Sequence, residues 1–192
     1  YVGYQAAYYQ TGNWNTAVGW ETFKGSTTPA NNTGGHNSAF GSWVLQNNTS
    51  GFQNAGCGNY SLGSNTSGSN NAAVGYQALY SNTTASNNTA VGFQAGYSNT
   101  TGGSGTFLGY RAGYAFNNAS TSWGDVYIGT NSGFNTTSGH DNCFVGGSSG
   151  STNTSGSYNV AVGSAALNAN TTASNNTAVG YQAGYANTTG DV

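Results

Sequence analysis

Charged residues are the scarcest class in this 192-residue sequence, which has two Lys or Arg, four Asp or Glu and a net charge of −2. Without a cluster of basic residues, the chain offers no electrostatic footprint for nucleic acid or for an anionic membrane surface. It also has no apolar run of about 18 residues or more, the length that a membrane-spanning helix requires. We therefore expect no nucleic-acid partner and no membrane insertion.

Residues that carry catalysis or bind metals are almost as scarce. The sequence has no Met, one Pro, two Cys and two His, and His36 and His140 lie far apart. Asp141 is the nearest acidic residue to either His, and no nucleophile motif, metal-spaced His/Cys cluster or pair of carboxylates on one strand is found. We expect that the protein is not an enzyme and that it uses no metal or cofactor.

Against this background one short phrase recurs, most clearly as Asn-Thr-Ala-Val-Gly at Asn88–Gly92 and Asn176–Gly180. Seven of the ten intervals between its closing glycines are 17 residues. A fixed period of this length indicates a solenoid, in which each repeat forms one coil. The closing glycines are Gly3, Gly19, Gly41, Gly58, Gly75, Gly92, Gly109, Gly129, Gly146, Gly163 and Gly180.

We predict an all-β fold, a parallel β-solenoid or β-roll of about eleven coils that forms a single repeat domain over residues 1–192. The coils at 20–41 and 110–129 are longer than the others, and neither end shows a capping element. Each coil is numbered below from its closing glycine, which is position 0.

Two neighbouring positions in each coil are non-polar, as in Ala90 and Val91, and successive strand residues point to opposite faces. This predicts a strand that is covered on both sides. One face of the strand carries bulky side chains at positions −1, +1, +3 and +5, as in Val91 and Phe93. The opposite face carries small residues at positions −2, 0, +2 and +4, as in Ala90 and Gly92. The pattern does not decide which face lies inside. We take the bulky face as the core and the bare face as a seam against another wall or chain.

Position −4 is repeatedly Asn, which predicts a ladder of side-chain amides bonded along the axis. Asp125 replaces Asn once in this column. The Asn residues at −4 are Asn15, Asn37, Asn54, Asn71, Asn88, Asn142, Asn159 and Asn176.

Cys57 and Cys143 lie five coils apart, or roughly 24 Å at about 4.8 Å per strand. This distance is too long for a disulfide between them.

The two ends of the sequence complete each other. Placed end to start they read Gly-Asp-Val-Tyr-Val-Gly, and the interior contains nearly the same phrase at Gly124–Gly129. This predicts head-to-tail assembly, either within a longer repeat chain or between separate chains. The residues expected at the joint are Tyr1, Val2, Gly3, Gly190, Asp191 and Val192.

The phrase SNNTAVGYQAGYSNTTG, which combines residues 86–102 and 174–190, resembles the head repeats of trimeric autotransporter adhesins, whose β-roll carries an Asn-Ser-Val-Ala-Ile-Gly motif. It is still more similar to repeats of phage tail-fibre and bacterial surface fibre proteins. The resemblance covers most of the chain and implies a fibre outside the cell or on a virion. It also implies that three chains assemble in parallel. This chain departs from the adhesins in its longer coil and its 14 Tyr, 8 Phe and 4 Trp.

We therefore expect a structural fibre or filament unit that associates with itself, head to tail, as a parallel trimer, or both. It would be extracellular, on the cell surface or on a virion. The alternative is an adhesin or receptor-binding fibre head that recognises surface glycans through the long coils, where insertions often form a binding face. Candidate residues for recognition or lateral contact in these coils are Trp20, Lys24, Arg111 and Trp123.

Seven Asn at position +7 each begin Asn-Thr-Thr or Asn-Thr-Ser, the pattern of an N-glycosylation acceptor. The competing interpretation is a turn residue repeated by descent, and full glycan occupancy on adjacent coils would be crowded at about 4.8 Å spacing. These residues are Asn48, Asn65, Asn82, Asn99, Asn153, Asn170 and Asn187.

Overall fold

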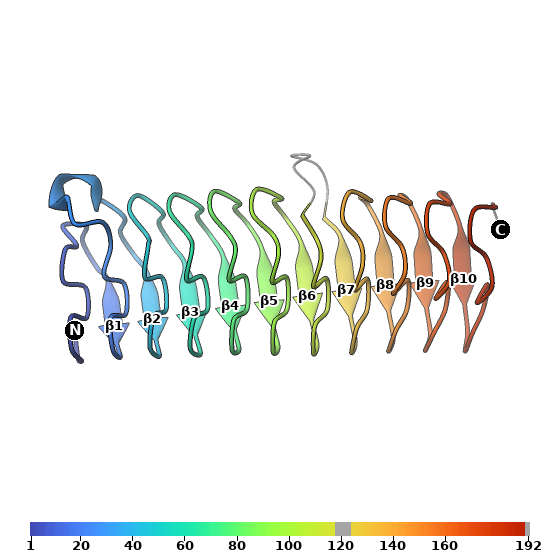
Figure 1. Cartoon of the computed structure of the whole chain (residues 1–192), viewed down its shortest axis with the longest axis horizontal. Coiled ribbons are helices and arrows are strands. Elements are labelled where there is room, and N and C mark those ends of the chain that lie inside the picture. Colours follow the sequence, from blue (N-terminus) through green and yellow to red (C-terminus); the bar gives the residue numbers. More distant parts are fainter. Residues whose placement is uncertain (118–123, 191–192) are drawn as a thin grey trace.

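The computed structural model describes residues 1–117 and 124–190, and these form a rod of stacked coils (Figure 1). One ten-stranded sheet runs along the rod, with all strands parallel and in sequence order. The predicted solenoid is thus confirmed, except that the coil of Gly3 contributes only an isolated bridge between Val2 and Val18. The strands are β1 (Thr16–Val18), β2 (Ser38–Phe40), β3 (Ala55–Cys57), β4 (Ala72–Val74), β5 (Thr89–Val91), β6 (Thr106–Leu108), β7 (Val126–Ile128), β8 (Cys143–Val145), β9 (Val160–Val162) and β10 (Thr177–Val179).

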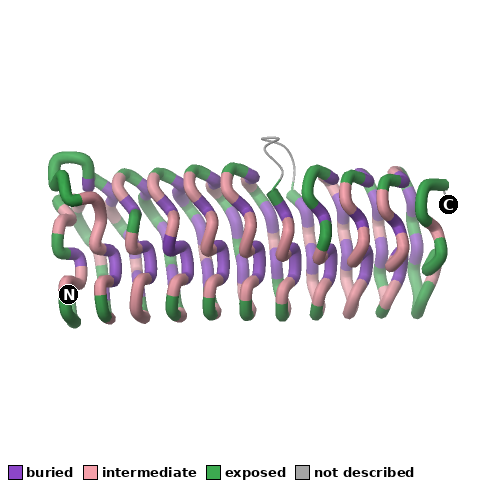
Figure 2. The backbone as a smooth tube through the Cα atoms, in the orientation of Figure 1, coloured by how far each residue is buried: buried purple, intermediate pink, exposed green. Residues whose placement is uncertain are grey.

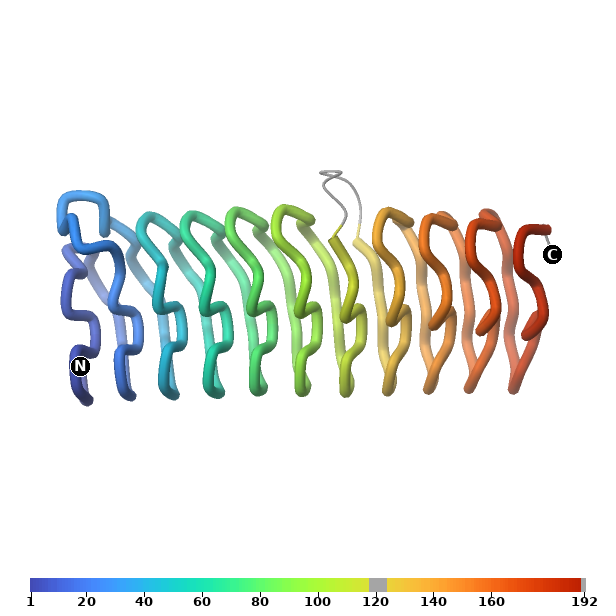
Figure 3. Tube along the Cα trace, in the orientation of Figure 1, coloured from blue at the N-terminus to red at the C-terminus, as the bar shows by residue number. Residues whose placement is uncertain are grey.

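The register is the same at every step, including across the two long coils. Thr16 of β1 pairs with Ser38 of β2, and Thr106 of β6 pairs with Val126 of β7, so each residue pairs with the same repeat position in the next coil. Figure 3 shows this stacking, with each coil beside its sequence neighbour from blue to red. The extra residues of the first long coil include a short 3-10 helix, η1 (Pro29–Asn31), at the upper edge of the rod in Figure 1. Added residues are therefore accommodated outside the sheet.

Each strand has only three residues because the closing glycine ends it. Gly92 has φ +137, and a Cβ placed on it would lie 2.3 Å from the backbone oxygen of Gly109 in the next coil. The following turn contains further left-handed residues, such as Gln77 with φ 56 and Leu79 with φ 50. Only a residue without a side chain allows the coils to stack this closely.

The predicted assignment of the two faces is wrong. The −2 residue is buried in every strand, whereas −1 residues such as Val74, with 45% of its surface exposed, face outward. The turn after Gly75 ends the alternation, so that Ala78 at +3 and Leu79 at +4 are both completely buried. The strand is therefore covered by this chain on one side only, and the small-residue face is the core.

The core is filled from positions −2 and +4, where a large side chain at one position is combined with a small residue at the other. Buried segments recur at the same place along the rod (Figure 2). Ala161 at −2 is matched by Leu167 at +4. In the coil before it, Phe144 at −2 is matched by Gly150, where a Cβ would lie 2.4 Å from the ring. The same large-with-small combination occurs in Phe107 with Gly113 and in Tyr127 with Gly133. Most coils thus hold one large side chain at these positions, whereas the coil of Gly92 has Ala90 and Gly96 and takes up Leu79 and Phe107 of the neighbouring coils instead.

Candidate functional site: inner asparagine ladders and an outer aromatic face

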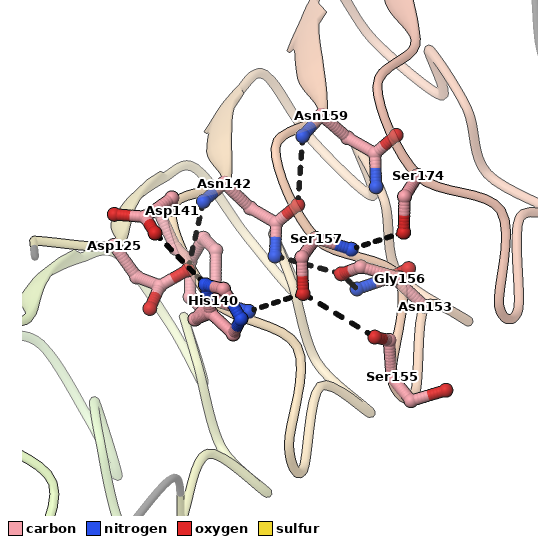
Figure 4. A network of polar contacts seen from close by, with 11 residues as sticks. Asp125, His140, Asp141, Asn142, Asn153, Ser155, Gly156, Ser157, Asn159 and Ser174 are labelled. Carbon is pink, nitrogen blue, oxygen red and sulfur yellow. Dashed lines mark hydrogen bonds and ion pairs between the residues drawn. The ribbon is translucent and has the colours of Figure 1, made fainter. Parts of the chain in front are cut away.

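The predicted Asn ladder at position −4 is confirmed. The Asn37 Oδ1 atom accepts hydrogen bonds from the backbone N–H of Asn54, at 2.9 Å, and from its Nδ2, at 3.1 Å. The Asn54 Nδ2 also donates to the backbone oxygen of Gly68, 14 residues later, at 2.8 Å. Figure 4 shows the same ladder between Asn142 and Asn159. Each amide thus joins its own coil to the next inside the rod, where a hydrogen bond is stronger than in water.

The ladder is modified at Gly105 and Asp125. Gly105 leaves room for the Phe107 ring, because a Cβ there would lie 2.4 Å from the ring. Asp125 is buried, and its Oδ1 accepts from the backbone N–H of Asn142 at 3.0 Å and from the Tyr127 hydroxyl at 2.9 Å. Burial raises the pKa of Asp125 to about 6, although these two hydrogen bonds oppose the shift. One protonatable carboxyl therefore stands in a column of neutral amides.

A second ladder lies at position +7, and the sequence pattern was not interpreted as one. The Asn65 Nδ2 donates to the Asn48 Oδ1 at 2.6 Å and to the backbone oxygen of Gly68 at 2.9 Å, and Asn82 repeats the arrangement. The signal available in the sequence was that Asn recurs at +7 in seven coils, almost as often as at −4. The members that are completely buried are Asn48, Asn65, Asn82, Asn99, Asn153 and Asn170.

This burial bears directly on the predicted glycosylation. A glycan is attached at Nδ2, and in these six residues Nδ2 is inside the folded rod and donates hydrogen bonds, for example from Asn99 to Gly102 and from Asn153 to Gly156. The folded rod therefore does not offer these atoms to a transferase. Asn187, in the last described coil, is only half-buried.

Aromatic rings form two columns on the outside of the rod. At position +1, Phe93 stacks between Tyr76 and Tyr110 with ring centroids 5.5 and 5.3 Å apart. At position +5, four rings stack in the same way at 5.1–5.4 Å: Tyr80, Tyr97, Tyr114 and Phe134. Stacks of this kind add stability and present flat apolar surface to solvent.

The predicted recognition residues do not meet in one place. Trp20 is 50% exposed and stacks on Tyr4 at 4.4 Å, and Lys24 in the same coil forms an ion pair with Glu21 at 3.0 Å. Arg111 lies five coils further along, roughly 24 Å at about 4.8 Å per strand. Trp123 lies outside the described residues. Trp20, Lys24 and Arg111 occupy ordinary turn positions rather than the inserted segments.

The predicted joint residues lie at the two ends of the rod. Tyr1 and Val2 are exposed, and Val2 donates its backbone N–H to Ala17, so the coil of Gly3 already follows the regular stacking. Gly190 is exposed at the other end, and Asp191 and Val192 lie outside the described residues. The joint itself is thus a prediction that the described residues leave untested.

Cys57 and Cys143 are both free thiols, as their separation predicted. Residues 1–117 and 124–190 contain no group of three or more His, Cys, Asp or Glu that could hold a metal ion. Within the same ranges, no helix is long and apolar enough to cross a membrane. No protein-family model matches the chain, and no similar curated protein or solved structure was found.

Proposed function

We propose that the protein is a structural shaft, a rigid unit of a fibre or filament that acts by its length and by association with further copies. The observation that carries this proposal is the unbroken register of the ten strands, which is kept across both long coils. Two amide ladders run along the same axis. Backbone pairing joins each strand to the next, and the ladders reinforce it on both sides of the coils of Gly109 and Gly129, where Gly105, Phe116 and Thr136 interrupt them. The same contacts therefore stiffen the rod over most of its length.

The outer surface supports association between copies side by side. Positions −1 and +1 flank the closing glycine and leave large apolar side chains exposed along the rod, which is unusual for a protein that functions alone. The −1 column repeats with the coil, and the +1 column carries rings at Tyr76, Phe93 and Tyr110, so a second copy in parallel register can match the first along these coils. The −1 residues concerned are Val18, Phe40, Val74, Leu108, Val162 and Val179.

The chemistry of the chain suits a location outside the cell or on a virion. It has only two sites for trypsin-like proteases, Lys24 and Arg111, and neither side chain is fully exposed. It has no Met to be oxidised. These properties agree with the fibre proteins that the repeats resemble.

Electron microscopy of the purified chain tests the proposal. Straight particles of uniform width are expected, and growth into long filaments would support the head-to-tail joint at Tyr1–Gly3. Irregular or compact particles would overturn the proposal.

Gly92→Ala and Gly147→Ala provide a matched pair of variants for this experiment. A Cβ on Gly92 meets the next coil at 2.3 Å, whereas a Cβ on Gly147 meets nothing within 4 Å. Gly92→Ala should break or destabilise the rods, and Gly147→Ala should leave them intact. Equal behaviour of the two would contradict the close-stacked interface on which the shaft depends.

A recognition function is the second candidate, and one observation favours it. The outer aromatic columns stop at a hollow beside Arg111, described next, which gives the rod one place that differs from its repeating surface.

A further inference from the structure

The outer aromatic columns end abruptly, and their end creates a groove. After Tyr110 the +1 column continues with Thr130 and Gly147, and after Phe134 the +5 column continues with Ser151. A groove of about 320 Å³ opens where the rings are missing. It is lined by Tyr110, Arg111, Asn131, Phe134, Ser148 and Ser151.

Arg111 is held in place at this groove before any ligand arrives. Its Nε donates to the Gln94 Oε1 at 3.0 Å, and its guanidinium lies 5.3–6.0 Å from the ring centroids of Phe93, Tyr110 and Tyr114. A guanidinium fixed by rings and a side-chain acceptor loses little freedom when it binds an anion.

The charge of Arg111 is also uncompensated. The chain has only two basic residues, and Lys24, the other one, is paired with Glu21. Among the described residues no carboxylate lies within ion-pair distance of Arg111. The only unpaired basic side chain among the described residues therefore lines the groove.

The remaining lining residues supply the other contacts that a sugar needs. Asn131 also lines the groove, and its buried Oδ1 has no hydrogen-bond partner within the described ranges. Ser148 and Ser151 provide hydroxyl groups, and Tyr110, 46% exposed, offers a ring on which the apolar face of a sugar can stack. The volume is at the small end of ligand pockets, which suits one or two sugar units.

We propose that this groove binds a saccharide that bears a carboxylate, with Arg111 pairing with the carboxylate and the serine and asparagine side chains binding the hydroxyls. A carboxylate is preferred over a neutral group because a charge-assisted hydrogen bond to guanidinium is about twice as strong as a neutral one. The inference goes beyond the shaft function and does not depend on it, since the groove lies within three adjacent coils of one chain.

Glucuronate and galacturonate are suitable probes, with glucose and galactose as their neutral counterparts. Titration of the purified chain, followed by ligand-observed NMR and calorimetry, should show binding of the acidic sugars at least about tenfold tighter than that of the neutral ones. Equal binding of acidic and neutral sugars, or no binding of either, would overturn the proposal.

Three variants locate the site. Gln occupies position +2 in other coils, at Gln77, Gln94 and Gln182, with the same left-handed backbone, so Arg111→Gln should fold. Its affinity for the acidic sugars should fall at least about tenfold. Ser151→Tyr extends the +5 column of rings into the groove and should block binding. Lys24→Gln removes the same charge elsewhere and should bind like the original chain.

The outcomes separate this proposal from the shaft function. Loss of sugar binding in Arg111→Gln with rods still visible by electron microscopy supports the site. Unchanged affinity in Arg111→Gln would refute it and leave the shaft proposal standing.

Discussion

At the residue scale, Asp125 is the one member of the inner ladders that works against the fold. Its neighbours in the column are Gly105 and Asn142, and Nδ2 of Asn142 donates to the backbone oxygen of Gly156, a bond that a carboxylate cannot make. The charged groups that face it are Asp141, which raises its pKa, and His140, which lowers it by a smaller amount. His140 is itself held by Asp141 at 2.8 Å (Figure 4). Burial therefore dominates.

The raised pKa of Asp125 predicts that stability falls as the pH rises. The folded chain holds the proton up to about pH 6, whereas the ordinary value is 3.8, so the folded state is favoured most below pH 3.8. Stability should decrease between about pH 4 and 6 and then level off, a change of about 3 kcal/mol for two pKa units. Chemical denaturation across this range measures it.

Asp125→Asn should remove this dependence and stabilise the rod at pH 7 by about 2–3 kcal/mol, because an amide restores the ladder without a buried charge. Glu21→Gln is the matched control, since it removes one carboxylate in a distant coil and outside the ladder. If Asp125→Asn keeps the original pH slope, the buried carboxyl is not its source.

At the element scale, most coils differ in which of two core positions, −2 or +4, holds the large side chain. Phe144 with Gly150 and Ala161 with Leu167 are alternative solutions to the same space in adjacent coils. Leu is compatible with the backbone at +4, because Leu167 there has φ 48 and Gly150 has φ 54. The core should therefore accept an exchange of the two solutions.

The double variant Phe144→Ala/Gly150→Leu should be much more stable than either single variant. Phe144→Ala alone leaves a cavity that costs about 3–5 kcal/mol, and Gly150→Leu alone places a Cβ 2.4 Å from the Phe144 ring. The combination reproduces the Ala161/Leu167 coil. A double-mutant cycle from denaturation midpoints should give a favourable coupling of at least about 2 kcal/mol, and purely additive losses would contradict the exchange.

The elements also show what the sequence could predict. The 17-residue period predicted the parallel sheet, and the recurring Asn at −4 predicted the ladder along the axis, because both features depend only on equal spacing. The orientation of the faces was not predictable from Ala90 and Val91 alone, since alternation was assumed to pass through Gly92. That glycine has φ +137 and ends the strand. The +7 ladder was missed because Asn-Thr-Thr also matches a glycosylation acceptor.

At the scale of the whole molecule, the chain covers its sheet on one side only. The inner side is filled by the −2, +3 and +4 residues, while the −1 and +1 residues stay exposed along the rod. Under the proposed shaft function, the exposed −1 side chains and +1 rings form the surface that a further copy covers. An interface of this kind grows with the number of coils that face each other.

Self-association should therefore depend on the outer columns rather than on charge. Val74→Ser with Tyr76→Ser removes apolar surface from one outer coil without touching the core, because both side chains are nearly half exposed. Sedimentation velocity should show weaker association of this variant, while its free energy of unfolding falls by only about 1–2 kcal/mol, because Tyr76 loses its stack on Phe93. Thr101→Ala, at an exposed turn elsewhere on the coil, is the control and should associate normally.

Raising the salt concentration should leave the original chain associated, because a contact between apolar columns is not screened by ions. Association that disappears in salt, or that survives the double substitution unchanged, would show that another face joins the copies.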